Sequence, residues 1–421
     1  MKLPLASLLL LPSVSALAQE IIVPSETASR ETLRLSAEQS TLRLGGLDLF
    51  PHVASMVNYD DNILISHTNQ MDDVVWTFSP GLTIAAGDVG AYLPGSVTLE
   101  QLRNLLYSST VDDVSKPSRF FALDYTPSFN VYTLHSENDN TGQSAMFSGA
   151  YALTRLALGL DADFADEYVK DAGVGDLVQV YRYDAYLRSR YDLTDRTSLE
   201  INGLYNGYQY AQPQYQGYND VKNEDWLNRQ FANRLNLGVG LGFGFVFPEG
   251  SPDQPYQQLL ARAVYRLTGK LYFNSALGVE LREYGSGQSD TVKPIFSVAG
   301  TYEVREGTTL TLEAHRRDEP SFTAGQNVTD LGASIGARQL LFGRLFATAS
   351  LGYDSFEYSA TSPGGSASRA DNYFFGRLRF DYEFNRHVTG SLFYTYYGDH
   401  SSYVIYSYND NVVGVQVTWR L

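Results

Sequence analysis

Strict alternation of apolar and polar residues, over segments far longer than ordinary strands, constrains this fold more than any other feature. It is clearest in 177–210, where two arms flank a short polar turn at 193–196. Each arm has roughly 14 residues, whereas strands usually have about 5–6. Side chains alternate faces along a strand, so each arm has one apolar face and one polar face. Strands this long are typical of sheets that cross a bilayer at a tilt. In the first arm, the two faces carry Tyr181, Tyr183, Ala185, Leu187 and Tyr191 against Arg182, Asp184, Arg188 and Arg190.

The same hairpin unit repeats along the chain. An aromatic or apolar residue precedes a tight polar turn at intervals of about 40 residues, which is two long strands plus one longer loop. These turns begin at Tyr151, Tyr191, Phe231, Tyr265, Tyr302, Leu341 and Tyr382. A fixed period of this kind predicts one large sheet built from hairpins, although the length of 421 residues alone would suggest several domains.

Composition excludes some functional classes. The net charge of -16 disfavours nucleic acid as a partner. The chain has no cysteine, so neither disulfides nor thiolate metal sites are possible.

The N-terminus reads as a secretory signal peptide over 1–18. Lys2 supplies the positive charge, 3–11 the apolar stretch, and Ala16 and Ala18 the small residues before a cleavage site. The alternative is a short membrane anchor, but the apolar run is well below the ~20 residues of a spanning helix. A membrane-spanning form must therefore be a closed barrel, because open sheet edges leave backbone groups without partners in lipid.

The alternation predicts an antiparallel up-and-down transmembrane β-barrel of about 18 strands over 50–421, after a periplasmic lead at 19–49. Short periplasmic turns should alternate with longer extracellular loops. The strands are expected at 53–59, 74–86, 119–134, 143–152, 156–169, 177–192, 197–210, 222–231, 235–247, 257–268, 270–284, 292–303, 308–317, 327–340, 344–358, 371–384, 388–400 and 410–421.

Two segments depart from this rhythm. Pro80, inside the second strand, predicts a bulge or an irregular edge position. The stretch 87–118 predicts a periplasmic insertion with a short helix at 96–106, because Leu99, Leu102, Leu105 and Leu106 have helical spacing. The alternative for this stretch is an extra pair of strands.

Several stretches resemble the outer-membrane barrel family named beta-barrel porin 2. They are 45–53, 58–64, the strand around Pro80, and the later Tyr-x-Leu-Thr turns. The alternating C-terminal strand also resembles the signal read by the barrel assembly machinery, with Leu421 in place of the usual Phe. The resemblance implies insertion into the outer membrane beside lipid and lipopolysaccharide. It also implies export of an exopolysaccharide together with a periplasmic export protein.

Charged residues of both signs fall on the inward parity. The candidates for pore lining are Arg182, Arg188, Arg190, Arg262, Arg266, Arg377, Arg379, Asp184, Glu280 and Asp381. Charged rings set the field that a hydrated solute crosses. The alternative is that these residues pair with one another and stiffen the wall. Arg188 and Arg190, with Arg377 and Arg379, are the candidates for a basic constriction.

Other chemistry is weakly indicated. The carboxylates of Asp60, Asp61, Asp72 and Asp73 around the first loop could suit Ca²⁺, or could form a solvated rim with Asx turns. Asp399 and His400 are adjacent and so should point to opposite faces, which argues against a catalytic dyad. We therefore expect no enzyme and no cofactor. The leading expectation is export of an exopolysaccharide. The first alternative is a general or sugar-selective diffusion porin, and the second is a plugged structural barrel.

Overall fold

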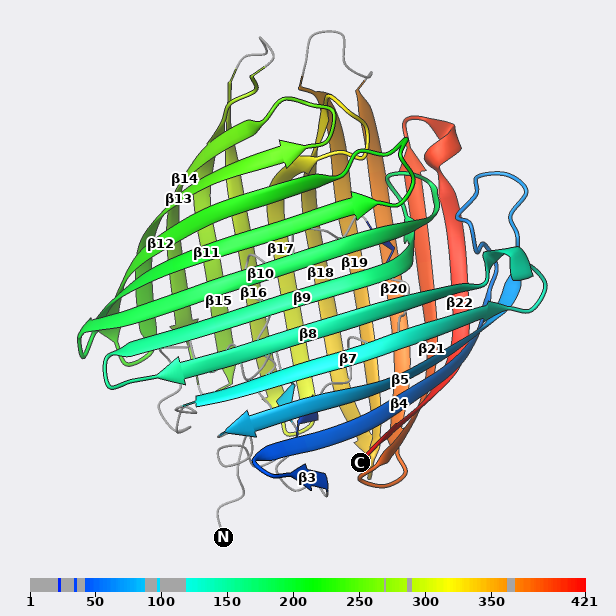
Figure 1. Cartoon of the computed structure of the whole chain (residues 1–421), viewed down its shortest axis with the longest axis horizontal. Coiled ribbons are helices and arrows are strands. Elements are labelled where there is room, and N and C mark those ends of the chain that lie inside the picture. Colours follow the sequence, from blue (N-terminus) through cyan, green and yellow to red (C-terminus); the bar gives the residue numbers. More distant parts are fainter. Residues whose placement is uncertain are drawn as a thin grey trace.

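The chain folds into one closed antiparallel barrel of 18 strands, β4, β5 and β7 to β22 (Figure 1). This confirms the fold expected from the alternation. The computed structural model describes residues 42–87, 119–268, 270–285, 290–361 and 368–421, and the backbone of three two-residue strands at 22–23, 34–35 and 97–98. Within those ranges, no helix has the length and apolar character needed to cross a membrane.

The barrel strands are β4 (Leu47–Asp60), β5 (Asp73–Gly87), β7 (Arg119–Tyr132), β8 (Asn140–Ala152), β9 (Leu156–Asp171), β10 (Asp176–Thr194), β11 (Thr197–Tyr210), β12 (Tyr218–Ala232), β13 (Leu235–Pro248), β14 (Gln254–Arg266), β15 (Leu271–Arg282), β16 (Thr291–Arg305), β17 (Thr308–Pro320), β18 (Gln326–Phe342), β19 (Leu345–Ala360), β20 (Arg369–Glu383), β21 (Val388–Ser401) and β22 (Tyr408–Arg420). Short strands β1 (Ile22–Val23), β2 (Arg34–Leu35), β3 (Leu42–Leu44) and β6 (Val97–Thr98) pair with β9, β6, β4 and β2, respectively. Two 3-10 turns, η1 (Ser136–Asn138) and η2 (Val404–Tyr406), lie in loops.

These strands agree with the expected ones in number and order, with differences only at their ends. The barrel begins at Leu47 rather than at 50, because the alternation already holds there and β3 pairs with the start of β4. The expected signal peptide and nearly all of the 87–118 insertion lie outside the described residues. Of the helix expected at 96–106, Val97 and Thr98 instead form β6.

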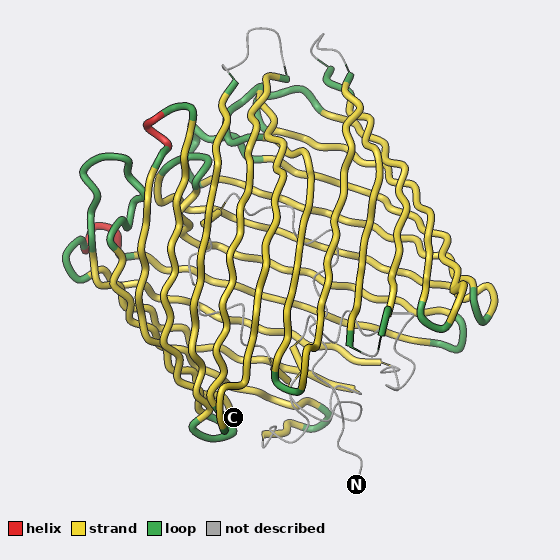
Figure 2. The backbone as a smooth tube through the Cα atoms, turned by 180° about the vertical axis from the view of Figure 1, so that it is seen from behind, coloured by secondary structure: helices red, strands yellow, loops and turns green. Residues whose placement is uncertain are grey.

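The two ends of the barrel differ in the length of their connections. Apart from the connection 88–118 between β5 and β7, one end, here the turn end, has two- to four-residue connections, such as Glu306 and Gly307. Gly307 takes the positive φ of +74° that a tight turn needs. The other end, here the loop end, carries the longer connections, and Figure 2 shows them gathered together. The last strand reaches its end at the turn end, where the C-terminus lies (Figure 1).

Strand β13 shows why the wall has two different faces. Its odd residues, including Leu241 and Phe243, are exposed on the outer face, whereas the even positions from 238 to 244 are all glycines that face inward. A Cβ at Gly240 would lie 2.7 Å from the Trp226 ring, and one at Gly244 would lie 2.2 Å from the Tyr256 ring. The glycines therefore leave the space in which two aromatic rings lie against the inner wall.

The irregularity expected at Pro80 is confirmed. The β5–β7 ladder pairs Phe78 with Phe129 and Leu82 with Tyr125, and skips the residues between them. In this register Pro80 stands opposite Pro127. Neither proline has a backbone N–H to donate, so the ladder is interrupted where the two meet.

Closure comes from pairing of the first and last long strands. β22 pairs with β4 from Val412 with Asp60 to Arg420 with His52. The Leu421 N–H donates to the Pro51 carbonyl at 3.1 Å, one residue beyond that ladder. This pairing joins the two ends of the sheet, so the first and last strands are not left as open edges, which lipid requires of a spanning sheet.

Candidate functional site

The part of the β17–β18 hairpin nearest the loop end bends away from the wall into the lumen. The ladder between β16 and β17 stops at Phe296 and Arg316, although β16 continues along β15 to Thr291 and β17 continues along β18 to Pro320. Beyond that point, 317–320 pair with β18 alone. The hairpin therefore separates from β16 while it stays attached to β18 and β19.

Residues that would face lipid if the hairpin stayed in the wall show that it lies inside the barrel. Asp318 and Thr329 share the parity of lipid-facing Leu331, yet both are buried. The Lys293 ammonium, from the inner face of β16, donates to the Asp318 carboxylate at 2.7 Å and to the Thr329 hydroxyl at 3.0 Å. The outer side of the hairpin thus packs against the inner side of its neighbouring wall.

Two further contacts fix this tucked position. The Arg282 guanidinium donates to the Asp318 backbone carbonyl at 3.0 Å, an oxygen that β16 would bind in a regular ladder. The Tyr284 hydroxyl, in the loop after β15, donates to the Asp318 carboxylate at 3.3 Å. Burial, helped by the nearby Asp318 charge, raises the pKa of Tyr284 to about 12, so the phenol keeps its proton at neutral pH.

The β9–β10 hairpin enters the lumen from another part of the wall. Its ladder with β8 stops at Gln143 and Asp166. Lys170 has the outward parity, but its ammonium lies 2.6 Å from the Asp60 carboxylate and 2.7 Å from that of Asp410. All three residues are buried. We call the ends of β9–β10 and β17–β18 the two inserted hairpins.

The two inserted hairpins meet beneath the loop end. Ala172 from the first and Val328 from the second belong to one buried cluster, which also contains Ile65, Phe356, Tyr358, Tyr373, Tyr397 and Tyr408. The Phe322 ring at the tip of β17–β18 lies 6.0 Å from Tyr215 on the opposite loop. The Arg369 guanidinium lies 3.9 Å from the ring centres of both Tyr358 and Tyr406. The loop end is therefore packed across, and a solute must pass these side chains.

A cavity of about 240 Å³ lies along the inner wall formed by β10 to β17. Paired charges line it: the Arg262 guanidinium is 2.6 Å from the Glu200 carboxylate, and that of Arg282 is 2.8 Å from Glu280. Aromatic faces support both arginines, with Arg262 4.4 Å from the Trp226 ring centre. Such a lining offers hydrogen-bond donors, acceptors and flat apolar faces together.

All ten residues predicted to line the pore lie on the inward parity of their strands. Many of them form ion pairs within the wall, as the alternative interpretation expects. The pairs are Arg182 with Glu167 (2.9 Å), Arg188 with Asp161 (3.7 Å), Arg190 with Asp192 (2.9 Å), Arg262 with Glu200 (2.6 Å), Arg282 with Glu280 (2.8 Å) and Arg379 with Asp381 (2.8 Å). Arg266 donates to the Tyr272 hydroxyl, Arg377 lies over the Phe375 ring, and Asp184 lies across from Asp163. Their effect on a solute stays a prediction.

The basic constriction predicted from four arginines is not assembled as a unit. Arg188 and Arg190 lie on β10, whereas Arg377 and Arg379 lie on β20, about half-way round the barrel. Arg379 donates to Ser391 and Gln416 on its own side of the wall. Each pair of arginines therefore belongs to a separate local network.

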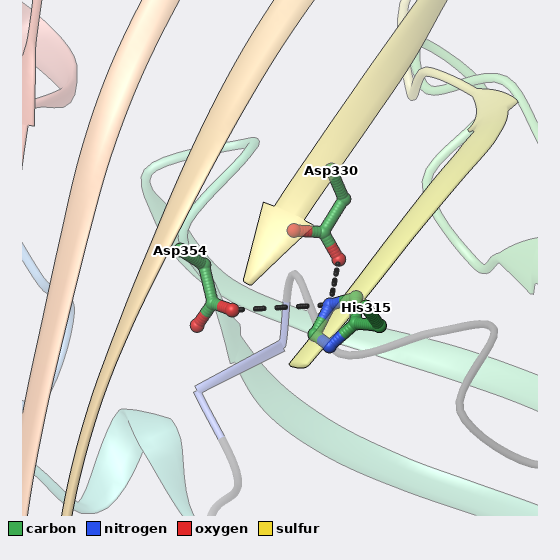
Figure 3. A group of neighbouring side chains, drawn as sticks. All are labelled: His315, Asp330 and Asp354. Atoms are coloured by element: carbon green, nitrogen blue, oxygen red, sulfur yellow. Dashed lines mark hydrogen bonds and ion pairs between the residues drawn. The ribbon is translucent and has the colours of Figure 1, made fainter. Parts of the chain in front are cut away.

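Sequence reasoning missed a group of His315, Asp330 and Asp354 on three neighbouring strands (Figure 3). His315 lies opposite Gly332, and Gly332 lies opposite Asp354, so a glycine separates the two side chains. A Cβ at Gly332 would be 1.9 Å from the Asp354 carboxylate, so only glycine leaves this space. A glycine flanked by polar inward residues on both neighbouring strands was the available signal.

Three such ligands could hold a divalent cation, but the Arg317 guanidinium already supplies a positive charge to this group. The His315 ring nitrogen lies 2.9 Å from the Asp330 carboxylate, and the Arg317 guanidinium lies 2.7 Å from the same oxygen. Arg317 also pairs with Glu319 at 3.2 Å. The group therefore functions as an ion-pair network at the base of the β17–β18 hairpin.

The carboxylates that might have bound Ca²⁺ have separate partners. Asp60 accepts from the Asn62 N–H in an Asx turn, and Asp61 accepts from the Asn411 amide. Asp73 accepts from the backbone N–H groups of 134 and 135 at 3.0 and 2.8 Å. This is the Asx-turn alternative rather than a shared cation site. Asp399 is buried, whereas its neighbour His400 is exposed, so the two do not form a dyad.

Comparison with known proteins finds similarity among solved structures. No protein-family profile and no curated protein sequence matches the chain. Solved structures do. OpdK of Pseudomonas aeruginosa, solved with vanillate, is 14% identical over 89% of this chain and 99% of its own, with a TM-score of 0.42. OccAB3 of Acinetobacter baumannii is 10% identical over 89% and 100%, with a TM-score of 0.45. The siderophore receptor PirA of P. aeruginosa is 9% identical over 89% and 80%, with a TM-score of 0.41.

Proposed function

We propose that this chain is an outer-membrane diffusion channel for small polar solutes. Large apolar side chains cover the outer face of nearly every strand, and charged, amide and hydroxyl groups fill the inner face. A closed barrel with this distribution suits a lipid exterior and a hydrated interior. An 18-strand barrel is wide enough to hold an aqueous lumen.

The observation that carries the proposal is the cavity along β10 to β17. Its volume of about 240 Å³ is below the ~300–1,000 Å³ of most ligand pockets, so it suits a small solute. Lys222 and Arg282 have acidic partners within this lining, Glu224 and Glu280, so the cavity offers both signs of charge. Hydroxyl-rich or weakly charged solutes match such a surface better than strongly charged ones.

The packed loop end argues against polymer export, which the family resemblance implied. A polysaccharide chain must keep a continuous wide path, whereas the rings of Tyr215 and Phe322 meet across the outlet. The same packing supports a second candidate, a plugged structural barrel. The two candidates differ in one measurable property, which is whether solute passes while the barrel stays folded.

Permeation of purified protein in lipid vesicles tests the proposal. We expect vesicles with the barrel to take up a monosaccharide and to exclude an oligosaccharide of five or more units. Single-channel recording should give small, discrete currents. Equal uptake of both sugars would support a wide export pore, and no uptake with no current would support the plugged barrel. Heat-modifiable gel mobility of the same sample reports whether the barrel is folded.

A further inference from the structure

The wall between β16 and β17 has an opening near the loop end. Strands β15 and β16 remain paired up to Arg282 and Thr291, and β17 and β18 up to Pro320 and Asn327. Between these two pairs, 291–295 and 317–320 make no ladder with each other among the described residues. Pro294 lies on this margin and has no N–H to offer. Five residues of strand correspond to a length of about 16 Å along the strand.

The cavity reaches the outer face of the barrel at this opening. Leu277, Phe296 and Arg316 form one row across β15, β16 and β17, immediately below the opening. Leu277 is 52% exposed on the outer face, yet it lines the same cavity as the inward-facing Trp226. One cavity lined from both faces of a wall connects the lumen with the lipid side.

The chemistry at the opening is amphipathic. Leu277 and Phe296 present apolar surface, and Arg316 places a guanidinium beside them. That guanidinium donates to the Pro294 carbonyl, and no described carboxylate pairs with it. A guanidinium without a carboxylate partner on a lipid-facing surface has a high free-energy cost unless an anion binds to it. An acyl or aromatic carboxylate would satisfy both parts of the surface.

We propose that this opening is a lateral binding site for amphipathic monocarboxylates, which reach the lumen cavity from the membrane. The carboxylate pairs with Arg316, and the apolar part lies past Leu277 and Phe296 toward the Trp226 ring. The site goes beyond the proposed function, because it does not require that hydrophilic solutes pass the packed loop end.

Intrinsic fluorescence can test this directly, since the chain has only three tryptophans. Trp76 and Trp419 face outward, whereas Trp226 faces inward and is buried. In W76F/W419F protein, Trp226 is the only tryptophan. The probe is bromododecanoic acid, added to the protein in phosphatidylcholine vesicles. We expect saturable quenching of Trp226, and an at least tenfold weaker apparent affinity in the further variant R316A, with R316K close to the parent.

Matched variants make the test specific. Arg229 is another outward-facing arginine, on β12 and far from the opening, so R229A should leave quenching unchanged. L277F should narrow the opening and weaken quenching, and it adds no second tryptophan to the W76F/W419F protein. The proposal would be overturned if quenching were not saturable, or if neither R316A nor L277F changed it. Equal quenching by a brominated phosphatidylcholine would also overturn it, because Trp226 would then simply contact bulk lipid. Monosaccharide uptake by the same vesicles is a separate readout, and its loss would concern only the diffusion channel.

Discussion

Gln254 and Asn327 bind each other through two side-chain hydrogen bonds, although three strands lie between theirs around the barrel. Each amide nitrogen donates to the oxygen of the other, at 3.0 and 2.9 Å. Gln254 points inward from β14, and Asn327 belongs to the outward parity of β18. The pair can form only because the β17–β18 hairpin lies inside the lumen, so it fastens that hairpin to the opposite side of the opening.

Breaking this pair should release the hairpin and raise conductance. Leaving one buried amide without its partner costs about 1–3 kcal/mol. We expect Q254L and N327L each to raise the open probability in single-channel recordings by roughly tenfold, since about 1.4 kcal/mol is a factor of ten. The double variant should recover part of the closure, because neither amide is then left without the other. Recovery stays partial, because Arg282 also donates to the Gln254 oxygen at 3.3 Å and loses that acceptor. The control is Q416A, at an inward amide on the far wall. Unchanged currents in both single variants would show that the pair does not hold the hairpin.

Replacing Lys170 should loosen the other inserted hairpin. K170M would leave the buried carboxylates of Asp60 and Asp410 together without their cation, a change of about 3–5 kcal/mol for a buried pair. We expect faster thermolysin cleavage near 172–180 while the barrel keeps its heat-modifiable mobility. Lys270 is exposed at the turn end, so K270M should leave the cleavage rate unchanged. Equal cleavage of parent and K170M protein would contradict the role given to Lys170.

Gly332 should tolerate no side chain. A Cβ there would come within 2.4 Å of the His315 ring as well as meeting Asp354, and overpacking of this kind costs about 1–3 kcal/mol. We expect G332A to lower the midpoint of thermal unfolding in detergent. At Gly300 the nearest atom to an added Cβ is 3.9 Å away, so G300A serves as the matched control. A midpoint for G332A as high as that for G300A would contradict this account.

High pH should weaken the contact between Tyr284 and Asp318. The pKa of Tyr284 is raised from 10.0 to about 12, so its contribution to folding is complete below pH 10 and is lost as pH rises toward 12. Above that range the phenolate can no longer donate to the carboxylate. We expect the open probability to be level up to about pH 9.5 and to rise between pH 10 and 12. Y284F should abolish this rise, and a rise of the same size in Y284F would point to other groups.

The outer and inner faces should respond oppositely to a charge. Leu241 lies midway along β13 on the lipid side, where arginine costs about 2–4 kcal/mol. Asn274 is exposed on the inner face of β15. We expect L241R to reduce folding yield in vesicles sharply and N274R to fold normally. Comparable yields for the two variants would contradict the assignment of faces.

The alternation of apolar and polar residues predicted the barrel, because successive side chains of each strand face lipid and the barrel interior in turn. The strand count and the inward position of Arg182 or Glu280 follow from that contrast alone. The inserted hairpins do not, because the parity of Lys170 and Asp318 is the same whether the strand stays in the wall or curls inward. An outward-facing polar residue near a loop is also expected where a strand extends beyond the membrane into water, so such a residue does not by itself indicate an inserted hairpin. Likewise, the approach of His315 to Asp354 depends on cross-strand register, which local pattern does not contain.

The two inserted hairpins come from different parts of the wall, and each on its own fills part of the outlet. Displacing one leaves the other in the path, so full opening needs both displacements at once. With independent hairpins, the fraction of fully open molecules would be the product of two small populations. Ala172 and Val328 instead belong to one buried cluster, and the packing of that cluster couples the two hairpins. A stimulus that moves either hairpin should then favour movement of the other, which would give this barrel steep, switch-like conduction.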